Sequence, residues 1–111
     1  MQKLPSQKSE GCETLALHLR AEGIAFTREL KFHKTRKWRL DFALIRGIHE
    51  QKIGIEVDGG LWVQGRHSRG AGMEADFVKL NECALQGYLV LRFSTGMVKD
   101  GTAIETIKRA L

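Results

Sequence analysis

Two short apolar runs, separated by a few polar positions, constrain the fold of this chain more than any other feature. They occupy residues 38–45 (WRLDFALI) and 53–60 (IGIEVDGG). Because residues two apart in a strand share a face, we expect every second residue from Trp38 to Leu44 on one face, and Ile53, Ile55 and Val57 likewise on one face. A third run at 26–32 precedes them, and both links are short. The three runs predict an antiparallel meander.

The remaining patterns predict helices around a fourth strand. Apolar residues recur at helical spacing over 10–21, with Ser9 as the candidate N-cap, and again over 73–86. The run 88–93 (YLVLRF) fits a buried central strand, and 102–111 fits a short closing helix. A helix between the third and fourth strands is a crossover, so these two strands should be parallel. The expected inner face of the second helix carries Met73, Phe77, Leu80, Ala84 and Leu85.

These elements define the expected fold class. It is α/β, in the order α-β-β-β-α-β-α, with a mixed four-stranded sheet flanked by helices. The chain has 111 residues, of which 42% are hydrophobic and 28% charged, as in a soluble globular domain. We expect a flexible polar tail at 1–8 and a single domain at 9–111.

Other bulk features bear on the cellular setting. No apolar run approaches the length of a membrane helix, and the start (MQKLPSQKSE) lacks a signal-peptide core. Cys12 and Cys83 lack CxxC spacing, so we expect them as core thiols in a reducing compartment. These features predict an intracellular protein that does not associate with a membrane.

Three carboxylates interrupt the apolar strands. Asp41 lies in the first run, and Glu56 and Asp58 lie in the second. If the strands are neighbours, these like charges face one another, which is costly unless a cation compensates them. Hard oxygen ligands of this kind suit Mg²⁺, and the Val57 carbonyl would supply a further oxygen. The pattern therefore indicates a candidate metal site.

Further candidates for chemistry lie outside these strands. His67, in a glycine-rich loop, carries an imidazole that can accept a proton from water near neutral pH. Asp76 and Lys79 lie near the apolar face of the second helix, and Glu13 lies near that of the first. Each has an ordinary alternative as a solvated side chain, and Asp76 and Lys79 also as a surface ion pair at i,i+3 spacing.

The net charge of +5 is concentrated in two segments, at 28–39 and 66–69. Solvated turns would explain both segments. Cationic arms that touch a phosphate backbone would explain them equally, with an aromatic residue beside the first arm to pack or stack. The candidate DNA-binding residues are Lys31, Lys34, Arg36, Lys37, Trp38, Arg39, Arg66 and Arg69.

Together these residues resemble the PD-(D/E)XK, or restriction-endonuclease-like, nuclease superfamily. Within it the chain is similar to the branch of very-short-patch-repair endonucleases and their small phage and bacterial relatives, summarised as a Glu-Asp-X-His-Asp site. The resemblance covers nearly the whole chain after residue 8, and implies an αβββαβ core with its metal site on the second and third strands. The motifs that carry it are Glu13, Asp41-Phe42, Glu56-Val57-Asp58-Gly59-Gly60, His67, Asp76 and the segment 87–93 (GYLVLRF).

The resemblance implies metal-dependent hydrolysis of phosphodiester bonds in DNA. Asp41 and Glu56, with the Val57 carbonyl and Asp58, would hold Mg²⁺ or Mn²⁺. His67 would act as general base or polarise the scissile group.

It also implies supporting roles and shows two departures. Asp76 would orient His67, and Glu13 would bind a metal-bound water or a second ion. Asp58 stands where the wider superfamily has a lysine, so that His67 or Lys79 would take over the task of that lysine. Moreover, His67 follows Asp58 by a longer spacing than in many relatives.

We therefore expect a Mg-dependent endodeoxyribonuclease, either nicking or structure-specific, in DNA repair or recombination in a bacterial or phage-infected cell. A homodimer would place two sites on two strands. Two alternatives stay open. One is a non-catalytic nucleic-acid-binding module with the same fold, against which the clustered acids argue because phosphate binding requires cations. The other is a structural acid cluster, with Asp58-Gly59 as a turn and the acids paired to Arg39 and Lys52.

Overall fold

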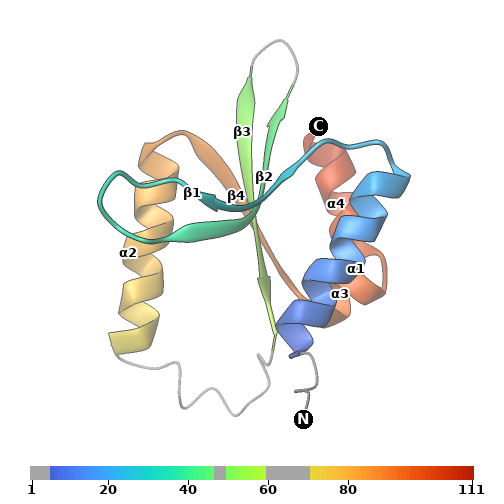
Figure 1. Ribbon diagram of the computed structural model, residues 1–111, viewed down its shortest axis with the longest axis horizontal. Coiled ribbons are helices and arrows are strands. Elements are labelled where there is room, and N and C mark those ends of the chain that lie inside the picture. Colours follow the sequence, from blue (N-terminus) through green and yellow to red (C-terminus); the bar gives the residue numbers. More distant parts are fainter. Residues whose placement is uncertain (1–5, 47–49, 60–70) are drawn as a thin grey trace.

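The structure, a computed structural model, describes residues 6–46, 50–59 and 71–111. Its order confirms the predicted α-β-β-β-α-β-α arrangement, with one addition, the short helix α3 (Figure 1). Ser94 begins α3 by accepting a hydrogen bond at Oγ from the Met97 backbone N–H at 3.1 Å. The elements are α1 (Gln7–Ala21), β1 (Thr27–Lys31), β2 (Arg39–Arg46), β3 (Gln51–Asp58), α2 (Ala71–Leu85), β4 (Tyr88–Ser94), α3 (Thr95–Lys99) and α4 (Thr102–Ala110).

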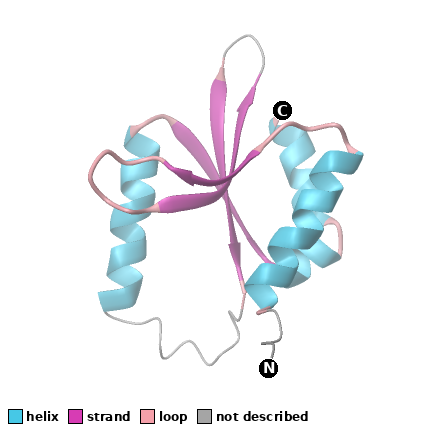
Figure 2. Ribbon diagram, in the orientation of Figure 1, coloured by secondary structure: helices cyan, strands magenta, loops and turns pink. Residues whose placement is uncertain are grey.

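The four strands form one mixed sheet in the order β1-β2-β3-β4. The β1–β2 and β2–β3 pairs are antiparallel, whereas β3 and β4 are parallel, as a helical crossover requires. Helices α1, α3 and α4 lie on one side of the sheet and α2 lies on the other (Figures 1 and 2). The predicted fold class is therefore confirmed. Within the described ranges, no helix is both long and apolar enough to span a bilayer.

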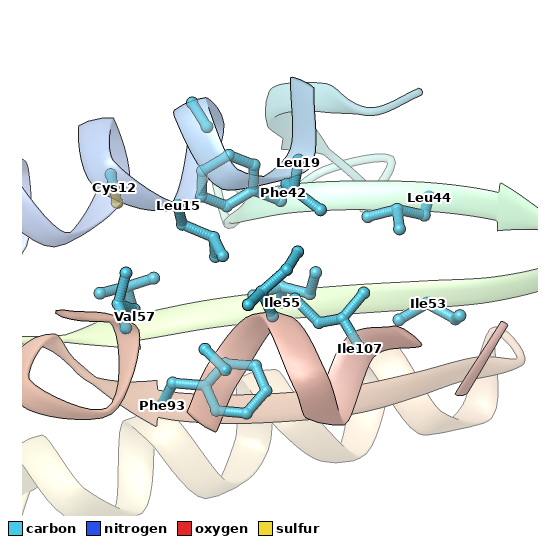
Figure 3. Close-up of a cluster of buried hydrophobic side chains, with 14 residues drawn as sticks. Cys12, Leu15, Leu19, Phe42, Leu44, Ile53, Ile55, Val57, Phe93 and Ile107 are labelled. Atoms are coloured by element: carbon cyan, nitrogen blue, oxygen red, sulfur yellow. The ribbon is translucent and has the colours of Figure 1, made fainter. Parts of the chain in front are cut away.

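The two sheet faces bury cores of unequal size. The larger core joins α1, α4 and one sheet face, and includes Leu15, Leu19, Ile55 and Ile107, all fully buried (Figure 3). Ile53, Ile55 and Val57 all belong to it, which confirms the predicted face of β3. The smaller core, under α2, has three buried members among the residues that the structure describes, Phe32, Leu40 and Cys83. Both thiols are buried and free, as predicted.

Strand β2 departs from the predicted two-residue period. Leu40 belongs to the smaller core and Phe42 to the larger one, although the sequence placed both on one face. The change coincides with Glu29 on β1, which has a φ of 56°. Glu29 lies between Arg28, the partner of Phe42, and Leu30, the partner of Leu40. A left-handed residue inside a strand breaks the regular pleat. The prediction of one continuous face from Trp38 to Leu44 is therefore wrong, and Asp41 lies where β2 changes faces.

Helix α2 turns a different side to the sheet than its apolar pattern predicts. Met73, Phe77 and Leu85 are exposed, at 41%, 54% and 80%, whereas Cys83 is fully buried. Ala84 is exposed as well, so the predicted inner face is wrong for four of its five residues, and Leu80 is partly buried. The helix is instead rotated so that Cys83 packs on the small core while Lys79 faces a buried glutamate on β3. An ion pair, which the apolar periodicity does not encode, contributes to this orientation.

Helix α1 begins earlier than its apolar pattern predicts. Ser6, not Ser9, is the N-cap, and its Oγ accepts a hydrogen bond from the Ser9 backbone N–H at 3.0 Å. The helix starts at Gln7, so Gln7 and Lys8, expected in a flexible tail, are helical. Two glycines allow this end of α1 to approach the sheet. A Cβ at Gly11 would lie 2.9 Å from Val57 Cγ1, and one at Gly59 would collide with the Lys8 backbone.

Candidate active site

Charged side chains from four elements converge where β3 ends. A pocket of about 140 Å³ opens there between the start of α1, the sheet and the first half of α2. Its lining combines three acids with three bases and a single apolar residue. The lining residues are Lys8, Glu56, Asp58, Asp76, Lys79, Leu80 and Arg92.

Glu56 lines the inner edge of this pocket, and Asp41 lies beside it, so that the two acids bridge β2 to β3. The backbone register between these strands runs to Phe42↔Ile55. Beyond that pair, hydrogen bonds from backbone N–H groups to side-chain carboxylates connect the two strands. The Val57 N–H donates to Asp41 Oδ2 at 2.8 Å, and the Asp41 N–H donates to Glu56 Oε2 at 3.2 Å. Both carboxylates are buried, so their positions are fixed by the sheet itself.

Asp41, Glu56 and Asp58 each meet a different cation. Lys79 Nζ lies 2.6 Å from Glu56 Oε1, and Lys8 Nζ lies 3.2 Å from Asp41 Oδ2. Arg92 donates to Asp58 Oδ2 through Nη2 at 2.6 Å and through Nε at 3.0 Å. Paired in this way, buried carboxylates do not carry the full cost of an isolated charge.

The cations are not those that the structural alternative named. Arg39 lies 3.8 Å from Glu29, and Lys52 lies over the Tyr88 ring at 5.1 Å from its centroid. The proposed pairing of the acid cluster with Arg39 and Lys52 is therefore wrong. The compensating charges come instead from α1, from α2 on the other side of the sheet, and from β4.

The electrostatics link the N-terminal turn of α1 to the acids. Burial by itself would lower the pKa of Lys8, but the charge of Asp41, its hydrogen bond and the charge of Glu56 together raise that pKa above its usual value. Burial, and then the charge of Asp41, raises the pKa of the nearby Cys12 thiol to about 11. Lys8 is thus held as a cation and Cys12 as a neutral thiol beside Asp41.

The structure brings together most of the predicted site residues that it describes. Asp41, Glu56, Asp58, Asp76 and Lys79 all contribute to the pocket or to its inner edge. The Val57 side chain is fully buried in the larger core, while its backbone lies against Asp41.

Glu13, in contrast, is not brought to this pocket. Its Oε2 accepts a hydrogen bond from Arg28 at 3.2 Å, and its side chain is 67% exposed. It lines a separate hollow with Ser9, Glu10, Thr14 and Lys99. The candidates Arg66, His67 and Arg69 lie outside the described residues.

Two members of the cluster were not anticipated from the sequence. Arg92 had a signal, because it is the one charged residue in the apolar run 88–93 and a buried strand favours such a residue only where it is paired. Lys8 had none, because it precedes the first apolar repeat of α1. It reaches Asp41 only because Gly11 and Gly59 let α1 pack closely on the end of β3.

The donor chemistry of the acids fits a hard divalent cation. Asp41, Glu56 and Asp58 offer carboxylate oxygens on adjacent strand positions, the type of ligand that Mg²⁺ takes. In the described part of the chain, no group of three or more His, Cys, Asp or Glu side chains is arranged as a ready metal cage. Lys8, half exposed, and Lys79 would therefore have to yield oxygens to an incoming ion.

The predicted basic arm between β1 and β2 is a structured turn. Lys34, Arg36 and Lys37 are exposed on it, and Lys31 and Arg39, also exposed, are the strand residues at its two ends. Trp38 is not presented to solvent as a stacking platform. Its ring stacks on Phe32 at a centroid distance of 6.1 Å, and the Arg36 guanidinium lies 4.9 Å from its centroid on the ring face.

Comparison with known proteins bears on the fold. No protein-family model matches the chain, and no curated protein matches it significantly. Among solved structures, the chain is similar to the catalytic domain of the homing endonuclease I-Bth0305I, with a TM-score of 0.60 and 22% sequence identity. The match covers 89% of each chain. At this identity the likeness concerns the fold, a mixed four-stranded sheet flanked by helices, consistent with a restriction-endonuclease-like core.

Proposed function

We propose that the protein is a metal-dependent endonuclease that hydrolyses phosphodiester bonds in DNA. The observation that carries this proposal is the pair of buried carboxylates, Asp41 and Glu56, that bridge two strands beside the cations Lys8 and Lys79. A structural salt-bridge cluster requires no pocket, whereas this cluster opens to solvent. The fold likeness to a homing endonuclease catalytic domain agrees with the proposal.

The metal ligands in this proposal are Asp41, Glu56 and the Val57 carbonyl, with Asp58 bound directly or through water. Mg²⁺, or Mn²⁺ in its place, supplies charge neutralisation at the phosphate and lowers the pKa of bound water. The chain contributes rigid placement, because each of the two buried carboxylates is hydrogen-bonded to the backbone of the neighbouring strand.

The basic side chains of the pocket orient the substrate. Lys8 is half exposed and Lys79 is largely buried, so Lys8 is the ammonium that can turn toward a DNA phosphate while Lys79 keeps Glu56 in place. Lys8 then takes over the task of the missing motif lysine, for which the family resemblance implied His67 or Lys79. His67 remains the proposed general base, with Asp76 on the pocket wall as its orienting partner.

The proposed substrate is DNA with a nick, branch or mismatch, in repair or recombination. The net charge of +5 and the exposed turn between β1 and β2 favour a polyanionic partner. A single site of this size makes one cut, so cleavage of both strands requires a second copy of the chain. A homodimer belongs to the proposal only for a double-strand cut.

Cleavage assays test this proposal. The protein is incubated with plain, nicked, branched and mismatched duplexes in Mg²⁺, Mn²⁺ or EDTA. Asp41→Asn and Glu56→Gln preserve shape but remove charge, so each should reduce cleavage by 10²-fold or more, about the effect of losing one electrostatic stabiliser. Glu105→Gln, an exposed acid on α4, is the matched control and should cleave normally.

The outcome separates the proposed enzyme from a binding module. DNA binding without cleavage in any metal, on every substrate, would replace the enzyme by a non-catalytic nucleic-acid-binding protein. Cleavage that survives in both Asp41→Asn and Glu56→Gln would move the active site elsewhere on the molecule.

A further inference from the structure

The turn between β1 and β2 is organised around one side chain, His33. Its Nδ1 accepts hydrogen bonds from the backbone N–H of Arg36 at 3.1 Å and of Thr35 at 3.3 Å. Because both partners are donors, Nδ1 carries no proton, and the ring proton lies on Nε2. Nε2 faces Glu82 Oε1 of α2 at 3.3 Å. One imidazole thus closes the turn on one side and attaches it to a helix on the other.

Aromatic packing holds the same turn against the body of the protein. The His33 ring meets the Trp38 ring edge to face at 5.0 Å, and Trp38 stacks on Phe32. Phe32 in turn contacts Tyr88 of β4 at 6.2 Å. A loop with this many ring contacts and backbone hydrogen bonds to a side chain has a defined shape before it meets any partner.

The turn presents its cations outward. Lys34, Arg36 and Lys37 are exposed, and a hollow of about 560 Å³ beside them is lined in part by Lys34 and Gln86. Glu82 of α2, which lies beside the turn, is already engaged by His33. A surface with three clustered cations fits a partner with regularly spaced anionic groups, as in a nucleic-acid backbone.

The attachment also fixes the turn relative to the candidate active site. Glu82 lies on α2, the helix that contributes Asp76 and Lys79 to the pocket. Glu82 follows Asp76 by six positions along the helix, which corresponds to about 9 Å along the axis. A phosphate held at the turn would therefore stand at a set distance from the pocket.

We infer that this turn is a preformed arm for the DNA phosphate backbone and that His33 is its positioning residue. The inference rests on the proposed function for the identity of the partner as DNA. His33 does not touch the reacting atoms. It holds Lys34, Arg36 and Lys37 in one geometry, so that fewer conformations are lost on binding.

Two substitutions distinguish the role of Nδ1 of His33, which closes the turn, from that of Nε2, which attaches the turn to α2. In His33→Asn the amide oxygen can occupy the place of Nδ1 and close the turn, whereas in His33→Gln the amide can reach Glu82 but leaves the Thr35 and Arg36 amides without their acceptor. A third variant, Lys34→Gln/Arg36→Gln/Lys37→Gln, removes the charges and keeps His33. Its control, Lys99→Gln/Lys108→Gln/Arg109→Gln, removes equal charge from exposed positions on α3 and α4.

DNA binding is measured in EDTA with all variants in an Asp41→Asn background, at several salt concentrations. Each phosphate contact contributes about 0.9 to the slope of log affinity against log salt, which is about fivefold in affinity at 0.15 M salt. The triple variant of the turn should therefore bind on the order of 10²-fold more weakly, with a slope lower by about 2.7. His33→Gln should bind DNA about fivefold or more weakly, and its salt slope should be lower by about 0.9 or more, the contribution of one phosphate contact. His33→Asn should keep most of the affinity and of the slope.

Cleavage kinetics of the same variants with Asp41 left unchanged provide a second readout. His33→Gln should raise KM and leave kcat within about twofold, because binding at a remote arm is lost equally from ground and transition states. If the triple variant of the turn binds DNA no worse than the control on α3 and α4, the arm is refuted. If it binds worse but His33→Gln and His33→Asn both bind normally, the positioning role of His33 is refuted. Binding that follows the prediction in a protein that cleaves nothing would sustain the arm and reject the nuclease.

Discussion

The ion pair between Lys79 and Glu56 gives the sharpest test of how the acidic site is held together. The two charged atoms are 2.6 Å apart, and the side chains are only 18% and 11% exposed. Lys79→Met keeps the aliphatic part of the side chain and removes its charge. Glu56 then stays buried with the Asp41 N–H and the more distant Lys8 as its remaining described support.

The expected loss of stability follows from that burial. Removing one partner of a buried pair costs roughly 3–5 kcal/mol, and the residual support of Glu56 places this site near the lower end, at about 3 kcal/mol. For a domain of this size, about 4 °C of Tm corresponds to each kcal/mol, so Tm should fall by about 12 °C. Adding Glu56→Gln, which removes the stranded charge, should recover about 2 kcal/mol of the loss.

Urea denaturation and thermal melting at pH 7 measure these changes. The matched control is Lys99→Met, which breaks the exposed pair of Lys99 with Glu10 at 3.1 Å, where the side chains are 54% and 46% exposed. Such a surface pair contributes at most about 1 kcal/mol. The reasoning fails if Lys79→Met is no more destabilising than Lys99→Met. It fails equally if the added Glu56→Gln brings no recovery.

A divalent ion adds an independent readout to the same experiment. An ion that binds only the folded protein stabilises it by RT ln(1 + [L]/Kd). If Glu56 is a metal ligand, millimolar Ca²⁺ should stabilise Lys79→Met more than the unmodified protein, because the competing ammonium is gone. Equal stabilisation of both proteins would remove Glu56 from the proposed ligand set.

Three further predictions follow from packing and burial. Gly59→Ala places a methyl group against the backbone at the start of α1 and should lower the free energy of unfolding by about 1–3 kcal/mol. Its control, Gly96→Ala, places the methyl group 3.8 Å from the nearest neighbouring atom and should have nearly normal stability, as urea titration of both variants can show. Burial raises the pKa of the Cys12 and Cys83 thiols to about 11 from 9.0, so their contribution to stability is complete below pH 9 and should be lost as pH rises through 11. Unfolding measured against pH should show this fall, and a variant with both cysteines replaced by alanine should show a smaller one, because the raised pKa of Lys8 and of Tyr88 contributes to the rest. Phe77→Ser should change stability by less than about 1 kcal/mol because Phe77 is 54% exposed, and a loss as large as that of a core residue would show that α2 is oriented otherwise.

The strands illustrate what local pattern can predict. Ile53, Ile55 and Val57 alternate in a strand of ordinary pleat, and their shared burial follows from the two-residue period alone. The parallel pairing of β3 with β4 follows from the helix between them. Short links between the first three strands were enough to bring Asp41 near Glu56.

Local pattern did not predict the position of a residue where a partner distant in the sequence determines it. The period of β2 breaks at the level of the left-handed Glu29 on the neighbouring strand, which no pattern within β2 reveals. The apolar stripe of α2 points partly to solvent because the helix also directs Lys79 to Glu56. Glu13, whose sequence context resembles a site residue, pairs instead with Arg28.

The sequence by itself determined the order of elements, the mixed sheet and the gathering of acids on two adjacent strands, because these depend on periodicity and on short connections. Only the tertiary structure decided which cation meets which acid. Lys8 reaches Asp41 because two glycines let α1 approach the end of β3, and Arg92 reaches Asp58 through the parallel register of β3 and β4. The physical reason is that a charge–charge contact requires atoms within about 4 Å. Residues far apart in the chain come that close only through packing, and that packing is settled by the whole core.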